Sequence, residues 1–152
     1  MATVQLADSS LDIQHTMFIE DLFSDAYEQF DGDERANHVG IAVSLAEQYK
    51  YDYGSTRITF FVSDTDVLKV PLGPNGQEQN WLEADTSGRD GKFGEIPIAD
   101  CYLIMQRGVE VLMMERVHPA TMSLKELPDW AWSVDGAQIG YDLEGRLVAY
   151  DL

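Results

Sequence analysis

The sequence predicts an α+β fold, in which an antiparallel sheet built from hairpins is packed against helices. Two patterns predict it: apolar residues recur at helical spacing in the first third, and short β-rich runs joined by turn residues fill the rest. The chain has 152 residues, of which 45% are hydrophobic, enough for the core of one ordinary domain. We therefore expect residues 1–152 to form a single domain, with an acidic helical segment over 1–55 and a sheet region over 56–152.

The first expected helix runs from Leu11 to Phe30, and Ser9 or Ser10 is a candidate N-cap. Its apolar side consists of Ile19, Phe23, Tyr27 and Phe30. Its other side carries four acids that we call the acidic stripe: Glu20, Asp21, Asp25 and Glu28. Like charges at this spacing repel one another, and the helix has no basic residue to relieve them. The acidic stripe is therefore our candidate partner-binding surface.

A second helix is expected after the Asp31-Gly32-Asp33 break, ending near residues 52–54. Beyond Gly54 the pattern changes to strands. Three hairpins are predicted, joining residues 57–62 to 67–70, 102–105 to 109–114, and 139–141 to 147–150. Residues 77–84 are a short helix candidate, and the glycine-rich residues 87–94 are expected to be a flexible loop.

The chain is strongly acidic, with 27 acidic and 10 basic residues and a formal net charge of −17. This charge repels nucleic acid phosphates and anionic membranes, so we expect neither as a direct partner. Three interpretations stay open: simple solvation of the surface, adaptation to high salt, or complementarity to a basic protein surface. Cys101, the one cysteine, favours a reducing compartment, and no leader or membrane-spanning run is apparent, so a cytoplasmic location is expected.

Residues 53–152 contain a series of short segments whose order along the chain is informative. Tyr53-Gly54-Ser55-Thr56-Arg57 precedes a strand, Lys69 lies in the next strand, and Glu83 follows in a helix candidate. Residues 112–117, which include Glu115, and a late hairpin with Gln138 and Asp151 complete the series. The series resembles the nucleotide-binding lobe of protein kinase and aminoglycoside phosphotransferase-like proteins, particularly small kinase-like proteins encoded by bacteriophages.

The resemblance implies roles for these residues. Lys69 would contact nucleotide phosphates and pair with Glu83, while the strand and hinge around Glu115 would hold the adenine. Gln138 and Asp151 would take the metal-binding positions of the family, with ATP and Mg²⁺ as the ligands. The departures are informative, because the phosphate-covering loop has one glycine, glutamine replaces the metal-binding asparagine, and no His-Arg-Asp triplet supplies a base. The sequence also contains no activation segment or substrate-binding helices after Asp151.

Two main hypotheses follow. The first is a non-catalytic acidic binding protein without a cofactor, in which a degenerate, pseudokinase-like lobe serves as scaffold. It would be an inhibitor of phage or mobile-element origin that binds a basic surface of a host nucleic-acid-handling protein in the bacterial cytoplasm. The alternative is a minimal nucleotide-binding protein or phosphotransferase that uses Lys69, Glu83 and Asp151. A third possibility is an assembly or structural protein whose charge only solvates it.

Overall fold

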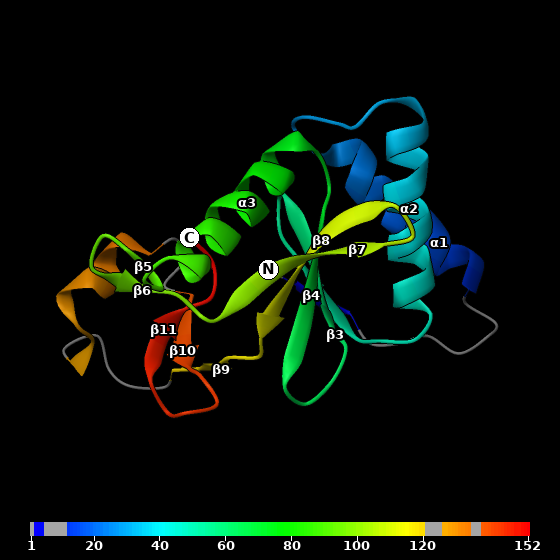
Figure 1. The fold of residues 1–152 in the computed structure, drawn as a ribbon. Helices are drawn as coiled ribbons and strands as arrows, with labels where there is room; N and C mark the ends of the chain where they lie inside the picture. The colour runs from blue at the N-terminus through cyan, green and yellow to red at the C-terminus, as the bar shows by residue number, and fades with distance from the viewer. Residues whose placement is uncertain (1, 5–11, 121–125, 135–137) are drawn as a thin grey trace.

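The structure is a computed structural model that describes residues 2–4, 12–120, 126–134 and 138–152 (Figure 1). The helices in these residues are α1 (Asp12–Asp25), α2 (Gly32–Ala46) and α3 (Pro74–Gly88), with a short 3-10 helix at Asp129–Ser133. Because the strands pair into antiparallel sheets, the predicted α+β class is confirmed.

The largest sheet has six strands in the order β1-β2-β3-β4-β8-β7. In that order these strands span Ala2–Val4, Tyr51–Tyr53, Arg57–Phe61, Asp66–Pro71, Val109–Glu115 and Cys101–Gln106. A three-stranded sheet consists of β11 (Leu147–Ala149), β10 (Ile139–Tyr141) and β9 (His118–Pro119), and a two-stranded one of β5 (Lys92–Phe93) and β6 (Ile96–Pro97).

All three predicted hairpins are present, as β3–β4, β7–β8 and β10–β11. The clearest turn joins β7 to β8, where Gln106 pairs with Val109 and only two residues lie between them. Those two residues, Arg107 and Gly108, have φ of 49° and 81°. Positive φ at both positions gives the turn the twist that matches the flanking strands.

The helix boundaries differ from those expected. The first helix ends at Asp25, not Phe30, so Tyr27 lies in a bend and is 93% exposed instead of joining the core. The second helix ends at Ala46, and the chain then enters β2, where Tyr51 is fully buried. Tyr51 packs on Phe60 with ring centroids 5.5 Å apart, so tertiary contact overrides the helical pattern.

Two further expectations need correction. The helix predicted over 77–84 is longer, because Pro74 starts it at a position where the missing N–H costs nothing. Residues 87–94 contain the end of α3 and the strand β5 instead of forming only a loop. The candidate N-cap, Ser9 or Ser10, lies outside the described residues.

The two faces of the six-stranded sheet are covered by different helices (Figure 1). Alternate residues of a strand point to opposite faces. Leu68 and Val70 of β4 face the core formed with α1 and α2, whereas Val67 belongs to a second core. The first core includes these residues of the helices and sheet: Ile19, Phe23, Ile41, Ala42, Ile58, Phe60, Val109 and Val111. The opposite face receives α3, which contacts β4, β7 and β8.

The bend after α1 is held against the start of α3 by a close backbone approach at Gly73. A Cβ atom at this position would lie 1.9 Å from the carbonyl oxygen of Glu28. Any side chain would therefore push the bend away from α3. Gly40, in the middle of α2, is the opposite case, because a Cβ there meets nothing within 4 Å.

We predict opposite effects for alanine at these two glycines. Gly73→Ala should lower the free energy of unfolding by about 1–3 kcal/mol, since the backbone must move to relieve the clash. Gly40→Ala should raise it by about 0.5–1 kcal/mol, since alanine favours the helix. Urea unfolding of the two variants measures both, and equal effects would contradict the close approach of Glu28 to Gly73.

Candidate functional site

A cluster of charged side chains lies between α3 and the sheet. Arg57 of β3 and Lys69 of β4 share a face because Arg57 pairs with Pro71, two residues along from Lys69. On α3, Asn80 and Glu83 are three residues apart and so point the same way, toward these cations. The side chains of Arg57, Lys69, Asn80 and Glu83 are all buried.

Glu83 is the common partner of both cations. Its Oε1 accepts hydrogen bonds from Arg57 Nη1 at 2.8 Å and from Lys69 Nζ at 3.2 Å. Its Oε2 accepts from Arg57 Nη2 at 2.9 Å, so the guanidinium binds the carboxylate with two parallel bonds. Asn80 adds two contacts, accepting from Arg57 at 3.0 Å and donating to the carbonyl of Lys69 at 3.2 Å. We call Arg57, Lys69, Glu83 and Asp151 the ion network.

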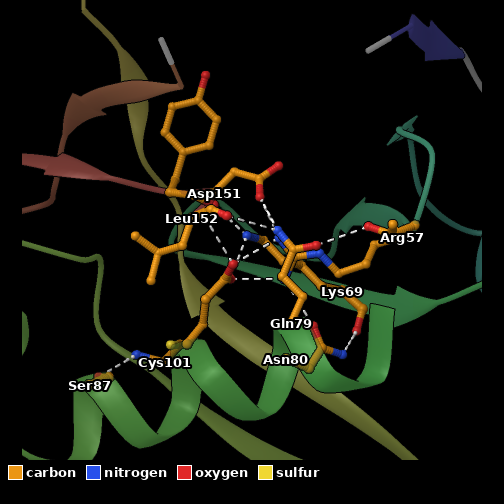
Figure 2. A network of polar contacts seen from close by, with 11 residues as sticks. Arg57, Lys69, Gln79, Asn80, Ser87, Cys101, Asp151 and Leu152 are labelled. Atoms are coloured by element: carbon orange, nitrogen blue, oxygen red, sulfur yellow. Dashed lines mark hydrogen bonds and ion pairs between the residues drawn. The ribbon is translucent and has the colours of Figure 1, made fainter. Parts of the chain in front are cut away.

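The last residues of the chain complete the ion network (Figure 2). Asp151 accepts from Arg57 Nη2 at 2.9 Å and from the side chain of Gln79. The Leu152 N–H donates to Glu83 Oε2 at 3.3 Å, and Lys69 Nζ donates to the carbonyl oxygen of Tyr150. Residues more than 65 positions apart in the sequence are thereby joined across one buried centre.

The charges of the ion network balance, with two cations against two carboxylates. Burial tends to raise the pKa of Glu83, but Lys69 and Arg57 outweigh burial and hold it below its usual value. Burial lowers the pKa of Lys69, and the nearby positive charge of Arg57 lowers it further. A buried charge without a partner costs several kcal/mol, so each member depends on the others. Lys69 is thus already engaged by the protein itself.

A cavity of about 660 Å³ borders the ion network. Its walls include Thr59, Phe61, Val67, Met114, Glu115 and Gln138. Two of the atoms in its lining residues, Asp52 Oδ1 and Gln138 Oε1, are buried and have no hydrogen-bond partner among the described residues. The volume is in the range of small-molecule sites. The cavity is therefore large enough for a small molecule, although the cations that line it, Arg57 and Lys69, are already paired with carboxylates.

The structure brings some of the predicted site residues together. Lys69 and Glu83 form the pair that the resemblance implies, and Gln138 and Asp151 both line the cavity. Asp151, however, is bound to Arg57 and Gln79. Within the described ranges, no group of three His, Cys, Asp or Glu side chains could hold a metal ion.

Glu115 has a different contact from the one that the resemblance implies. Its Oε1 accepts a hydrogen bond of 2.7 Å from the N–H of Leu143, in the turn between β10 and β11. Burial raises the pKa of Glu115. The side chain thus ties the end of β8 to the three-stranded sheet while it lines the cavity.

Sequence reasoning missed Arg57, Gln79 and Asn80. The signal for Arg57 was available, because it alternates with the apolar residues Ile58 and Phe60 and so shares the face of Thr59. Thr59 is paired with Lys69, which places both cations on one face of the sheet. Gln79 and Asn80 gave no comparable signal, because amide side chains are common on exposed helix faces.

The acidic stripe is exposed along its whole length. Glu20, Asp21 and Asp25 lie on α1, and Glu28 lies in the bend that follows it. Residues 1–55 contain only two basic residues, Arg35 and Lys50. Arg35 donates to the hydroxyl of Ser24 at 3.0 Å, which links α2 to α1 without pairing with an acid of the stripe.

No protein-family model, curated protein or solved structure matches this chain at a significant level. Among the described helices, none is long and apolar enough to cross a membrane.

We predict that Glu83→Gln lowers the free energy of unfolding by about 3–5 kcal/mol, because it leaves two buried cations with one carboxylate between them. Glu78→Gln is the matched control, since Glu78 lies on the same helix but is exposed. It should change stability by less than about 0.5 kcal/mol. Denaturant unfolding of both variants measures this, and a loss below about 1 kcal/mol for Glu83→Gln would be inconsistent with a structural ion network.

Proposed function

We propose that this chain is a non-catalytic acidic binding protein that acts through contact with a basic protein surface. The kinase-like lobe would serve as scaffold, and the acidic stripe would meet the partner. A nucleic-acid-handling protein fits this role because its binding surface is basic, and an inhibitor of phage or mobile-element origin would act by covering that surface. The exposure of all four acids of the stripe is the observation that carries the proposal.

The engagement of Lys69 supports the non-catalytic part. Phosphoryl transfer requires a cation, a metal and a base to be held around the phosphates. Here the ammonium of Lys69 contacts Glu83 and the carbonyl of Tyr150, and Arg57 is bound by Glu83 and Asp151. A pair such as Lys69–Glu83 is itself compatible with phosphate binding. What opposes it here is that Lys69 is only 3% exposed and also donates to the carbonyl of Tyr150, while Arg57 would have to leave a carboxylate.

The surroundings of the acidic stripe support the binding part. The stripe borders a groove of about 740 Å³ between the bend after α1, the β2–β3 turn and the start of α3. The charged residues that line it are Asp25 and Glu28, both acids, and Tyr27 beside them is 93% exposed. Exposed aromatic side chains next to charge are frequent anchors in protein interfaces. A concentrated negative field also speeds association with a basic partner.

The alternative, a minimal nucleotide-binding protein, is favoured by the cavity next to the ion network. It predicts that ATP with Mg²⁺ raises the melting temperature, whereas our proposal predicts no shift at millimolar ATP. Lys69→Ala is a poor test because it also removes a partner of Glu83. Gln138→Ala is the better variant, because Gln138 lines the cavity and its Oε1 has no hydrogen-bond partner within the described part of the chain. A saturable shift in the native protein that Gln138→Ala abolishes would overturn the non-catalytic proposal.

For the acidic stripe, we predict that changing its four acids to Gln or Asn slows association with a basic protein captured from a bacterial lysate. The difference should vanish near 1 M salt, where the screening length is about 3 Å. Folding stability should stay equal or rise by a few tenths of a kcal/mol, because like charges on a helix repel.

A matched variant removes four exposed acids elsewhere: Asp64, Glu78, Glu95 and Asp129. It changes the net charge equally and should leave the association rate much closer to that of the native protein. Association kinetics at several salt concentrations measure both variants. Equal slowing by both would mean that net charge alone acts and that the stripe has no special role.

A further inference from the structure

A second, smaller cavity lies away from the ion network, where α2, α3 and the β7–β8 hairpin meet. Its volume is about 320 Å³. It is lined by Glu34, Asn37, His38, Gln77, Trp81 and Met105, and by residues 108–110 of the hairpin. The charged residues of this lining are two acids, Glu34 and Glu110. The cavity is therefore suited to a cation.

His38 contributes an unused hydrogen-bond acceptor. The side chain is only 4% exposed and stacks on Phe30, with ring centroids 3.9 Å apart. Its Nδ1 lies 2.7 Å from the carbonyl oxygen of Glu34, which can only accept, so Nδ1 carries the proton. Nε2 then holds a lone pair, and it has no partner among the described residues. A buried acceptor of this kind is costly unless something donates to it.

The two carboxylates differ in their contacts. Glu110 accepts a hydrogen bond from the indole N–H of Trp81 through Oε1, which fixes the ring at the cavity wall. Its Oε2 and the carboxylate of Glu34 have no hydrogen-bond donor among the described residues. Trp81 is 48% exposed, and Met105 is 63% exposed. An aromatic ring and a flexible thioether suit the alkyl stem and the charge of a bound cation.

A metal ion fits this cavity less well than an organic cation. The described residues contain no group of three His, Cys, Asp or Glu side chains close enough to ligate one. A primary ammonium group carries three hydrogen-bond donors and no acceptor. His38, Glu34 and Glu110 offer acceptors along the cavity wall, and charge attraction does not require them to meet at one point as metal ligands must.

We propose that this cavity binds a primary alkylammonium group, with Glu34 and Glu110 balancing its charge, Trp81 forming one wall and His38 Nε2 accepting a hydrogen bond. The same chemistry occurs in a free diamine and in a lysine side chain of a partner protein. The proposal is independent of the acidic stripe, because none of the four stripe residues lines this cavity.

Binding should depend on pH through His38. Burial lowers the pKa of His38, although the carbonyl and the charge of Glu34 oppose this, so the ring is neutral at pH 7 and Nε2 is free to accept. Protonation of Nε2 removes the acceptor and adds a repelling charge. The facing charged groups are Glu34 on α2 and Glu110 on β8. Because the pKa of His38 lies below the ordinary value of 6.5, affinity should fall as the pH is lowered below 6.5.

The test uses NMR titration of the full chain with two probes, butane-1,4-diamine and Nα-acetyl-lysine amide. We expect saturable shifts at the Trp81 indole and at His38 Nε2 with both. Tighter binding of the diamine would identify a free amine as the ligand, and tighter binding of the blocked lysine a protein side chain; either result supports the site. Tetramethylammonium, which has the charge but no donor, should bind at least about tenfold more weakly.

Paired variants distinguish the site from general charge attraction. Glu34→Gln with Glu110→Gln should weaken binding by about tenfold or more, whereas Glu47→Gln with Glu78→Gln, both exposed and outside the cavity, should change it less than about twofold. His38→Phe should abolish the pH dependence; if it misfolds, the Nε2 shift in the native protein gives the same information. Equal weakening by both pairs, equal binding of tetramethylammonium, or no binding at millimolar concentration would overturn the proposal.

Discussion

The buried carboxylate of Glu83 is the interaction on which the rest of this structure depends. It binds Arg57 and Lys69 from two neighbouring strands and receives the N–H of Leu152, so α3, the sheet and the last residues of the chain meet at one side chain. Apolar packing alone would hold α3 on the sheet without fixing its position. The ion network fixes the position of α3 on the sheet, because hydrogen bonds to a buried charge have a defined geometry and are costly to break. The stability of the fold therefore depends on keeping the cations of the candidate site, Arg57 and Lys69, paired with their carboxylates.

The surroundings of Lys69 have a functional consequence. In our account, the burial of Lys69 and its contact with the carbonyl of Tyr150, rather than its pair with Glu83, oppose nucleotide binding through Lys69. The other face of the sheet is covered by α1 and α2, and the exposed acidic stripe lies on α1 and the bend that follows it. The two sides of the sheet thus have different tasks in our account: one holds the ion network, and the other supports the surface that meets a partner.

Much of the fold could be predicted from the sequence, because alternation and turn residues act locally. The turn at Arg107 and Gly108 and the strands beside it are examples. The end of α1 could not, since the apolar spacing continues through Tyr27 although the chain bends there. Lys69 and Glu83 were predicted as a pair only through a resemblance. Alternation places Arg57 on the face of Lys69, but it does not show what Arg57 contacts, because its partners Glu83 and Asp151 are 26 and 94 residues away.

The accessibility of Lys69 tests the central claim most directly. Acylation of the native chain with a succinimidyl ester, followed by mass spectrometry of its peptides, compares Lys69 with the exposed Lys50 and Lys92. A lysine that is 3% exposed and held by Glu83 should react about a hundredfold more slowly than those two, at a rate that ATP and Mg²⁺ do not change. Reaction of Lys69 as fast as Lys92, together with protection by ATP and Mg²⁺, would contradict the account.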